Sequence, residues 1–117
     1  LKLATKISSE QKNYNKNIKI FIQVNIGDEP QKSGISPDNL LSFKNKCVDE
    51  LNLNIIGLMC LPPINKEPSV YFKEMNYLLK KIDLKELSMG MSNDYLEAVN
   101  YNSSYVRIGS KIFGNRN

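Results

Sequence analysis

The sequence predicts an α/β protein built from parallel strand–helix units. Short runs of β-branched and apolar residues alternate along the chain with longer amphipathic stretches, and clusters of Gly, Pro and Asn separate them. Strands that alternate with helices form parallel sheets with right-handed crossovers. A leading helix is followed by four such units, which is half of an eight-fold barrel. The alternative is an open doubly wound sheet, but Gly27-Asp28-Glu29 after the first strand does not match its GxGxxG fingerprint.

Composition indicates one globular domain, residues 1–117. The 117 residues are 41% apolar, and no stretch approaches the roughly 20 apolar residues of a membrane helix. The net charge of +4 comes from scattered lysines and not from a dense basic stripe with aromatic residues, so we expect neither a nucleic acid nor a membrane as partner. The absence of histidine excludes Ser-His-Asp and Cys-His arrangements from this chain.

Residues 1–17 are expected to form a helix, Leu1–Gln11, followed by an Asn-rich loop. The run Ile18–Ile26 has the length and the β-branched composition of a buried strand, and Gly27–Pro30 ends it. Ser36 is the predicted N-cap of the next helix. Pro37 then occupies its first position, and the apolar stripe consists of Leu40, Leu41, Phe43, Cys47, Val48 and Leu51.

The rest of residues 18–114 completes the four β/α units. The predicted elements are a strand at Asn54–Leu61, a helix at Ser69–Ile82 whose stripe includes Val70, a strand at Glu86–Met89, a loop at Gly90–Asn93, a helix at Asp94–Tyr101, a strand at Tyr105–Ile108 and a last turn at Gly109–Phe113. The two cysteines, Cys47 and Cys60, lack zinc or CxxC spacing. We interpret them as buried reduced thiols of a cytoplasmic protein, with a disulfide as the alternative.

Two segments have the composition of a phosphate-binding cup, LSMGMS at 87–92 and VRIGS at 106–110. Each joins a short strand to the start of a helix, where free backbone N–H groups and the helix dipole favour an anion. The glycines allow close approach, and Ser92 and Ser110 add hydroxyl donors. In eight-fold barrels a phosphate site commonly forms after strands seven and eight. The alternative is a pair of ordinary strand–helix turns, each with a capping serine.

The same segments carry a family resemblance. LSMGMS followed by VRIGS and IFG resembles the closing signature of the pyridoxal-phosphate homeostasis family, the proline synthetase co-transcribed homologues. IQVNIGDEPQKSG, IIGLMCLPP and the acidic helix after Ser92 match in the same order, from about Ile18 to Gly114. The resemblance implies the C-terminal half of an alanine-racemase-like (β/α)8 barrel that binds pyridoxal 5′-phosphate (PLP). It also implies a non-catalytic role in vitamin B6 homeostasis, and therefore not an enzyme.

The resemblance implies a set of cofactor-binding residues. They are Ser92, Gly109 and Ser110 at the phosphate, Arg107 at the pyridine nitrogen, and Met91 and Asn25 lining the pocket. Members of the family hold PLP on a Schiff-base lysine in an N-terminal strand similar to V-S-K, and no such segment occurs here. Lys32 belongs to a different loop and is not expected to replace it. The chain begins roughly where a fifth barrel unit would.

Arg107 bears on the chemistry. A guanidinium stays protonated and has only donors, so a pyridine nitrogen that faces it has to stay unprotonated. An unprotonated pyridine is a poorer electron sink, which disfavours transaminase-type chemistry. The alternative is that Arg107 pairs with a surface carboxylate. Alternation along the predicted strand places it on the face opposite Val106 and Ile108, toward the barrel mouth, and this favours the cofactor role.

Two other functions stay open at this point. One is a fragment of a PLP-dependent amino-acid racemase or decarboxylase barrel, and the other is a phosphate-binding barrel half without PLP. A half barrel also leaves its first and last strands, Ile18–Ile26 and Tyr105–Ile108, as open edges beside uncovered apolar faces. We therefore expect the isolated chain to self-associate through these edges, for instance as a two-fold pair.

Overall fold

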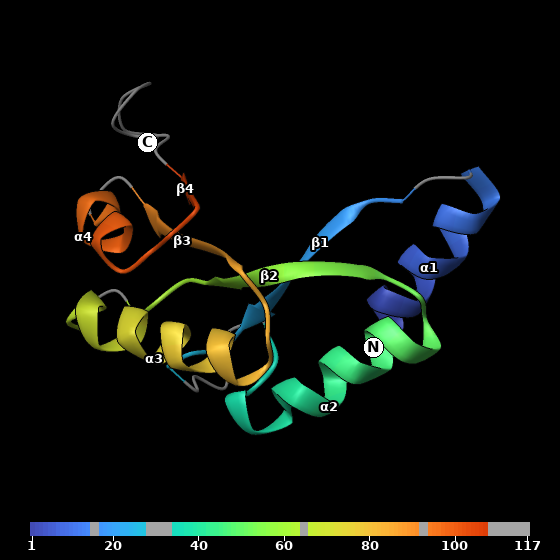
Figure 1. Ribbon diagram of the computed structural model, residues 1–117, viewed down its shortest axis with the longest axis horizontal. Helices are drawn as coiled ribbons and strands as arrows, with labels where there is room; N and C mark the ends of the chain where they lie inside the picture. The colour runs from blue at the N-terminus through green and yellow to red at the C-terminus, as the bar shows by residue number, and fades with distance from the viewer. Residues whose placement is uncertain (15–16, 28–33, 64–65, 92–93, 108–117) are drawn as a thin grey trace.

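The computed structural model describes residues 1–14, 17–27, 34–63, 66–91 and 94–107, which form one parallel sheet with helices against it (Figure 1). The strands are β1 (Lys19–Val24), β2 (Asn54–Cys60), β3 (Glu86–Met91) and β4 (Tyr105–Arg107). They lie side by side in chain order, and each pairs in parallel with the next. The predicted α/β class with parallel strand–helix units is confirmed, and so is the half-barrel arrangement.

The first helix precedes the first strand, and the other helices connect successive strands, as parallel pairing requires. In chain order they are α1 (Lys2–Tyr14), the 3₁₀ turn η1 (Pro37–Asn39), α2 (Leu40–Asn45), the π-helical η2 (Lys46–Glu50), α3 (Pro68–Lys81) and α4 (Tyr95–Asn100). Figure 1 shows α2 and α3 below the sheet, with α1 and α4 at its two ends. None of the helices in the described ranges is long and apolar enough to cross a membrane.

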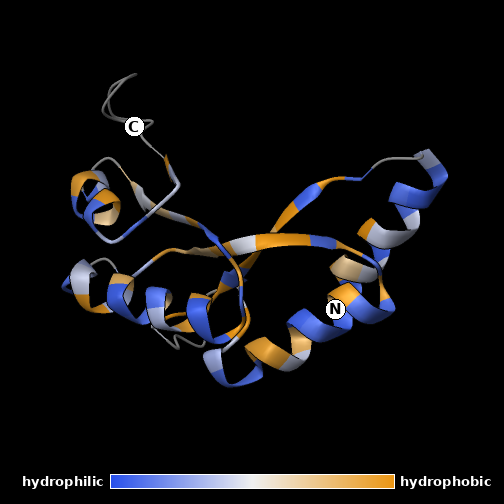
Figure 2. Cartoon of the chain, in the orientation of Figure 1, coloured by the Kyte–Doolittle hydropathy of each residue, from blue (hydrophilic) through white to orange (hydrophobic). Residues whose placement is uncertain are grey.

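The core lies between the sheet and its helices. Alternate strand residues point toward the helices, so the buried set comes in pairs from successive strands: Ile22 and Val24, Leu58 and Cys60, Leu87 and Met89. Phe72 and Met75 of α3 meet this layer and are fully buried. In Figure 2 the apolar colours follow the strands and the inner sides of the helices, while hydrophilic residues face outward. Cys47 and Cys60 are both buried within this layer, as expected.

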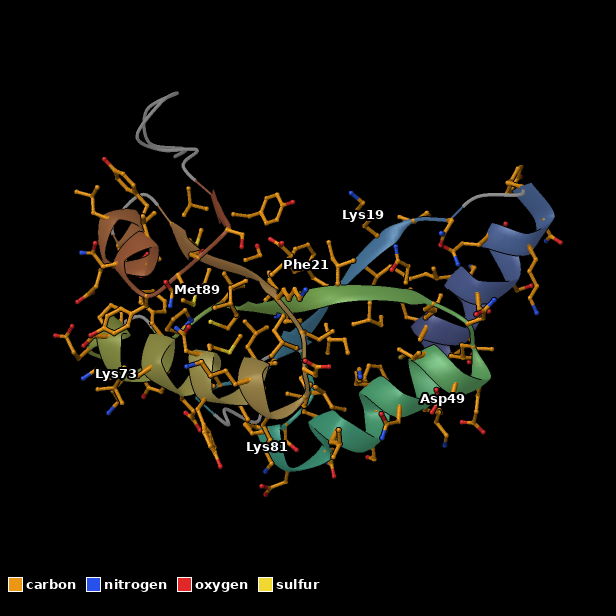
Figure 3. The ribbon with its side chains drawn as sticks, in the orientation of Figure 1. Lys19, Phe21, Asp49, Lys73, Lys81 and Met89 are labelled. Carbon is orange, nitrogen blue, oxygen red and sulfur yellow. The ribbon has the colours of Figure 1, made fainter. Side chains whose placement is uncertain are left out.

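The opposite face of the sheet is concave and carries no helix among the described residues. Lys19 and Phe21 lie on this face of β1 (Figure 3). The ring of Phe21 reaches that of Tyr105, with centroids 5.4 Å apart and planes at 86°. These two residues lie on the outermost strands, about 14 Å apart in a flat sheet with strands spaced about 4.8 Å. The edge-to-face ring contact therefore requires a curled sheet, as half of a barrel would be.

Several predicted boundaries were wrong by a few residues. Lys12–Tyr14 continue α1, although the sequence predicted a loop there. β1 ends at Val24 and not at Ile26, because the chain turns where the Ile26 N–H donates to the Val24 carbonyl at 3.0 Å. β3 extends through Gly90 and Met91, which were predicted to be loop.

The predicted cap and stripe residues were also partly wrong. Ser36 is extended before η1 but makes no side-chain capping hydrogen bond; its hydroxyl oxygen accepts from the Asn39 side-chain amide at 3.1 Å instead. Leu41 and Val70, which were predicted to belong to apolar stripes, are exposed at 45% and 61%. Both lie in the first turn of their helices, so each has neighbouring turns on one side only to define the buried face.

Candidate functional site

The sequence-predicted site residues with a described backbone converge on one edge of the sheet. Met91 is the last residue of β3 and Arg107 the last of β4, and the two are paired in the strand register. Asn25 directly follows β1. Because the strands are parallel, all three lie at the carboxyl edge, where active sites of β/α barrels form. Ser92, Gly109 and Ser110 lie outside the described residues, and of Arg107 only the backbone is described.

A bulge in β3 shapes this edge. Ser88 pairs with Tyr105 and Met91 with Arg107, so β3 uses one residue more than β4 over this stretch. Gly90 adopts φ +103°, a conformation that favours glycine. A Cβ at this position would lie 2.6 Å from the Ala98 Cβ of α4. Gly90 is therefore needed both for the bulge and for the close approach of α4.

The chain after β3 closes on itself. The Met91 N–H donates to Oδ1 of Asp94 at 2.7 Å, and the Asp94 N–H donates to the Met91 carbonyl at 3.0 Å. This pair fixes the start of α4. Free N–H groups were predicted for this segment. The prediction was wrong for Met91, whose N–H already has an acceptor. The sequence predicted only a favourable interaction of Asp94 with the helix dipole. Its hydrogen bond to Met91, three positions earlier, leaves no distinct pattern in the sequence.

The β1 end of the edge is held by the returning loop. The Asn25 N–H donates to the Ile35 carbonyl at 2.9 Å, and the Ile35 N–H donates to the Gln23 carbonyl at 2.9 Å. Gly34 precedes this bridge with φ +115°, and a Cβ there would meet the Asn25 nitrogen at 2.9 Å. Gly34–Ile35 therefore acts as a short extra strand segment that fixes the backbone of Asn25. Sequence reasoning missed this role, for which the Ser-Gly-Ile pattern at 33–35 gave only a weak signal.

Carboxylates surround the α4 side of the site. Desolvation first, then repulsion from Glu67 and Asp94 and a hydrogen bond with Glu67, raise the pKa of the Glu97 carboxyl. Negative charge gathered here disfavours a phosphate between α3 and α4.

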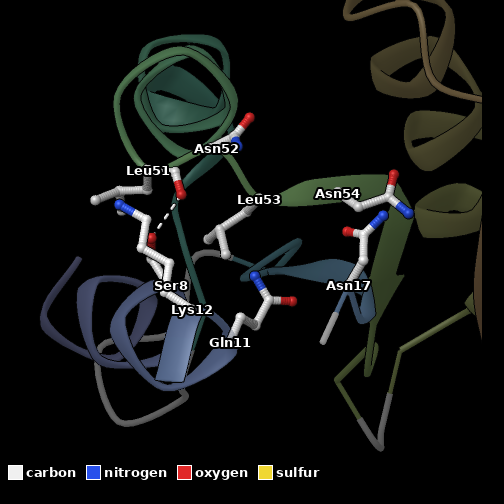
Figure 4. Close-up of a pocket in the computed structure, with 8 residues that line it drawn as sticks. All are labelled: Ser8, Gln11, Lys12, Asn17, Leu51, Asn52, Leu53 and Asn54. Carbon is white, nitrogen blue, oxygen red and sulfur yellow. Dashed lines mark hydrogen bonds between the residues drawn. The ribbon is translucent and has the colours of Figure 1, made fainter. Parts of the chain in front are cut away.

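A polar hollow of about 480 Å³ lies at the other end of the sheet (Figure 4). Its lining residues come from α1, from the end of η2 and from the starts of β1 and β2: Ser8, Gln11, Lys12, Asn17, Leu51, Asn52, Leu53 and Asn54. The Ser8 hydroxyl donates to the Leu51 carbonyl at 2.6 Å, and the Ile18 N–H donates to the Gln11 side-chain oxygen at 2.8 Å. These bonds attach α1 to the sheet. Neither Asn25 nor Met91, the predicted site residues whose side chains the structure describes, lines this hollow.

Comparison with known families identifies the fold family. The family model described as "Alanine racemase, N-terminal domain" matches residues 1–117, the whole chain. The chain belongs to the alanine racemase N-terminal domain family. The resemblance noted in the sequence is also confirmed, because the curated relatives are named pyridoxal phosphate homeostasis protein.

Three relatives from distant organisms illustrate the similarity. The Pasteurella multocida protein is 31% identical over 98% of this chain, the Aquifex aeolicus protein 34% over 83%, and the human protein 34% over 99%. These alignments cover 54%, 46% and 48% of the respective relatives. This member of the alanine racemase N-terminal domain family therefore spans about half the length of the curated relatives it matches.

Solved structures agree with the fold. PipY of Synechococcus elongatus without PLP superposes with a TM-score of 0.87 at 25% identity, covering 96% of this chain and 57% of PipY. The PipY structure with PLP bound superposes with a TM-score of 0.80 at 24% identity, covering 96% of this chain and 56% of PipY. At 24% identity, the similarity to the PLP-bound PipY structure shows a shared fold alone.

Proposed function

We propose that this chain forms the C-terminal half of a PLP-binding barrel that serves PLP homeostasis without catalysing a reaction. The observation that carries the proposal is the pairing of Met91 with Arg107 at the carboxyl edge of a curled parallel sheet, next to the Gly90 bulge. Relatives that are 31% and 34% identical to this chain are named for PLP homeostasis. PipY, with the same fold, has been solved with PLP bound.

Each predicted site residue takes a separate part in this proposal. Ser92, Gly109 and Ser110 hold the phosphate with hydroxyl and backbone donors. Arg107 donates to the pyridine nitrogen. Met91 and Asn25 line the pocket; Met91 is 47% exposed at the end of β3, so it offers an apolar surface at the sheet edge.

The proposal of a non-catalytic role rests on the names of the relatives, which describe PLP homeostasis, and Arg107 bears on one class of PLP chemistry. PLP supplies an electron sink when its ring nitrogen is protonated, and an arginine partner, which only donates, keeps that nitrogen unprotonated. Such a site binds and orients the ring and disfavours transaminase-type chemistry. An amino-acid racemase or decarboxylase is the competing function, and turnover of an amino acid by the PLP-loaded protein would favour it. The two buried cysteines, Cys47 and Cys60, support the further proposal of a reducing, cytoplasmic setting.

We propose further that a complementary half barrel completes the site. The chain spans about half of its curated relatives, and the concave face with Phe21 and Tyr105 has no described covering element. The polypeptide that contains both halves is called the full-length protein below. In this proposal the lysine that carries PLP covalently belongs to the complementary half, and the 117 residues supply the phosphate and ring-nitrogen side.

A test of this division of labour uses the 117-residue chain alone. We expect no single lysine to be modified after incubation with PLP and borohydride reduction, because in this proposal the lysine that carries PLP belongs to the complementary half. Peptide mass spectrometry measures the adduct at each lysine. Low, scattered labelling is the expected result, and one stoichiometric adduct on a lysine of this chain would contradict the proposal. The full-length protein, treated alike, is the positive control.

The isolated chain is also expected to self-associate. β1 pairs with β2 only, except that Val24 also meets Ile35, and β4 pairs with β3 only among the described residues. Unpaired edges beside a concave face that carries Phe21 and Tyr105 favour association with another copy. Sedimentation velocity at micromolar concentrations should show a dimer or larger species.

Two variants place this association on the concave face. Phe21→Lys puts a charge on that face, next to Tyr105, and should shift the chain toward the monomer. Leu41→Lys removes an exposed apolar residue from α2, on the helical side, and should change nothing. A wild-type chain that sediments as one folded monomer would contradict this expectation.

A further inference from the structure

The turn between α4 and β4 is held by α3. Asn102 adopts φ +70°, in the left-handed region. The side-chain amide of Asn76, on α3, donates to the Tyr101 carbonyl at 2.6 Å, and its oxygen accepts from the Asn102 side chain at 3.2 Å. Left-handed conformations suit Asn more than most residues, which explains how the chain reverses here without glycine. After this turn, the Ser103 side chain lies next to β3.

The Ser103 hydroxyl bridges both backbone groups of one β3 residue. It accepts from the Met89 N–H at 3.2 Å and lies 2.7 Å from the Met89 carbonyl oxygen, to which it can donate. The Tyr105 carbonyl is a second candidate acceptor at 2.8 Å. A hydroxyl has one hydrogen, so it donates to one of these oxygens at a time. Next to it, the Ser104 N–H donates to the Leu87 carbonyl at 2.8 Å.

These contacts lie where the regular parallel pairing of β3 and β4 is interrupted. β4 pairs with β3 at Ser88–Tyr105 and again at Met91–Arg107, so the Met89 and Gly90 stretch of β3 has one residue too many for its partner strand. Met89 is fully buried, and water cannot easily replace a lost partner for its backbone. The Ser103 side chain thus takes the place of a strand residue opposite Met89 and stabilises the bulge.

We propose that Ser103 is a positioning residue for the cofactor site. By stabilising the bulge, Ser103 fixes the backbone positions of Met91 at the end of β3 and of Arg107 at the end of β4. Ser103 itself does not contact the cofactor. The inference rests on the proposed PLP-binding function for its effect on the cofactor, and on the hydrogen bonds above for its effect on the backbone. Replacing the hydroxyl should therefore loosen the carboxyl edge of β3 and β4 and weaken PLP retention together.

The test compares Ser103→Ala with two rescue variants and one matched control in the full-length protein. Ser103→Thr keeps the hydroxyl, and Ser103→Cys keeps the size with a weak donor, so it serves if the alanine variant does not fold. Ser8→Ala is the control, because Ser8 also donates a part-buried hydroxyl to a backbone carbonyl, at 2.6 Å, but at the opposite end of the sheet. Three quantities are measured: denaturant stability, PLP affinity, and the ³¹P resonance of bound PLP.

We expect Ser103→Ala to weaken PLP binding about tenfold, which corresponds to about 1.4 kcal/mol. Its ³¹P resonance should shift, Ser103→Thr should restore both, and Ser103→Cys should be intermediate. Ser8→Ala should lose stability while affinity and resonance stay unchanged. If Ser103→Ala behaves like Ser8→Ala, Ser103 is only structural and the inference is wrong.

Hydrogen exchange of the PLP-free protein separates this inference from the proposed function. Ser103→Ala should speed amide exchange at 89–91 and at 105–107, whether or not PLP binds. Unchanged exchange there overturns the positioning role. Faster exchange in a protein that shows no bound PLP would leave the positioning role standing and overturn the proposed function instead.

Discussion

Replacing Gly90 with alanine is expected to lower the free energy of unfolding of the full-length protein by about 2–4 kcal/mol. Two costs add up. A non-glycine residue at φ +103° carries backbone strain, and the new Cβ would lie 2.6 Å from the Ala98 Cβ and 3.2 Å from Val106 Cγ1. Ala98 cannot move away, because it is fully buried and its Cβ is fixed to the α4 backbone. Chemical denaturation measures the change.

A double variant separates the two costs. Ala98→Gly removes the atom that the new Cβ would meet, at the expense of about 1 kcal/mol of helix propensity. In the double variant Gly90→Ala/Ala98→Gly, part of the loss from Gly90→Ala should be recovered, because the 2.6 Å contact is gone while the backbone strain and the propensity cost remain. If Gly90→Ala is tolerated with a change below about 0.5 kcal/mol, the bulge does not have the geometry described here.

Arg107→Gln in the full-length protein is expected to weaken PLP retention by about 1–3 kcal/mol, or about five- to 150-fold. The substitution removes a charged donor and leaves a neutral amide, which can still donate but more weakly. The visible absorbance band of bound PLP should also move, since the electronic state of the ring depends on what its nitrogen faces. Equilibrium dialysis and absorbance titration provide the two measurements.

Lys19→Gln is the matched charge control for this variant. It also removes one positive charge, but Lys19 begins β1, whereas Arg107 ends β4, so the two lie toward opposite edges of the parallel sheet. PLP retention in the control should stay close to that of the unmodified protein. Equal losses in both variants would indicate a general effect of net charge, and unchanged affinity and spectrum in Arg107→Gln would refute its assignment.

The order and type of the secondary structure followed from the sequence because they depend on local periodicity. The β-branched run at β1 and the apolar stripe of α3 are each visible within a short window. The ends were harder to predict, since they depend on tertiary partners. Residues 12–14 continue α1. This helix is held by the bond of Ser8 to Leu51, far along the chain, and by the bond of Gln11 to Ile18, beyond the following loop.

The candidate site was predictable in its location and not in its detail. Glycine and serine after short strands indicate where a parallel sheet could bind an anion, and Met91 and Arg107 indeed meet at that edge. The bulge at Gly90 was not predictable, because a register shift is a relation between two strands. Ser103 was missed for the same reason: a serine before a strand indicates a turn, and only the folded sheet brings it to Met89.

Hydrogen–deuterium exchange of the full-length protein with and without PLP tests the central claim most directly. The account predicts that PLP slows exchange at the carboxyl edge, in peptides covering 23–26, 86–94 and 105–110. It predicts no change at the other end of the sheet, around Ser8 and Asn52, which line the polar hollow. Protection confined to that hollow, or no protection anywhere in these 117 residues, would contradict the claim that this half of the barrel holds the phosphate and the ring nitrogen.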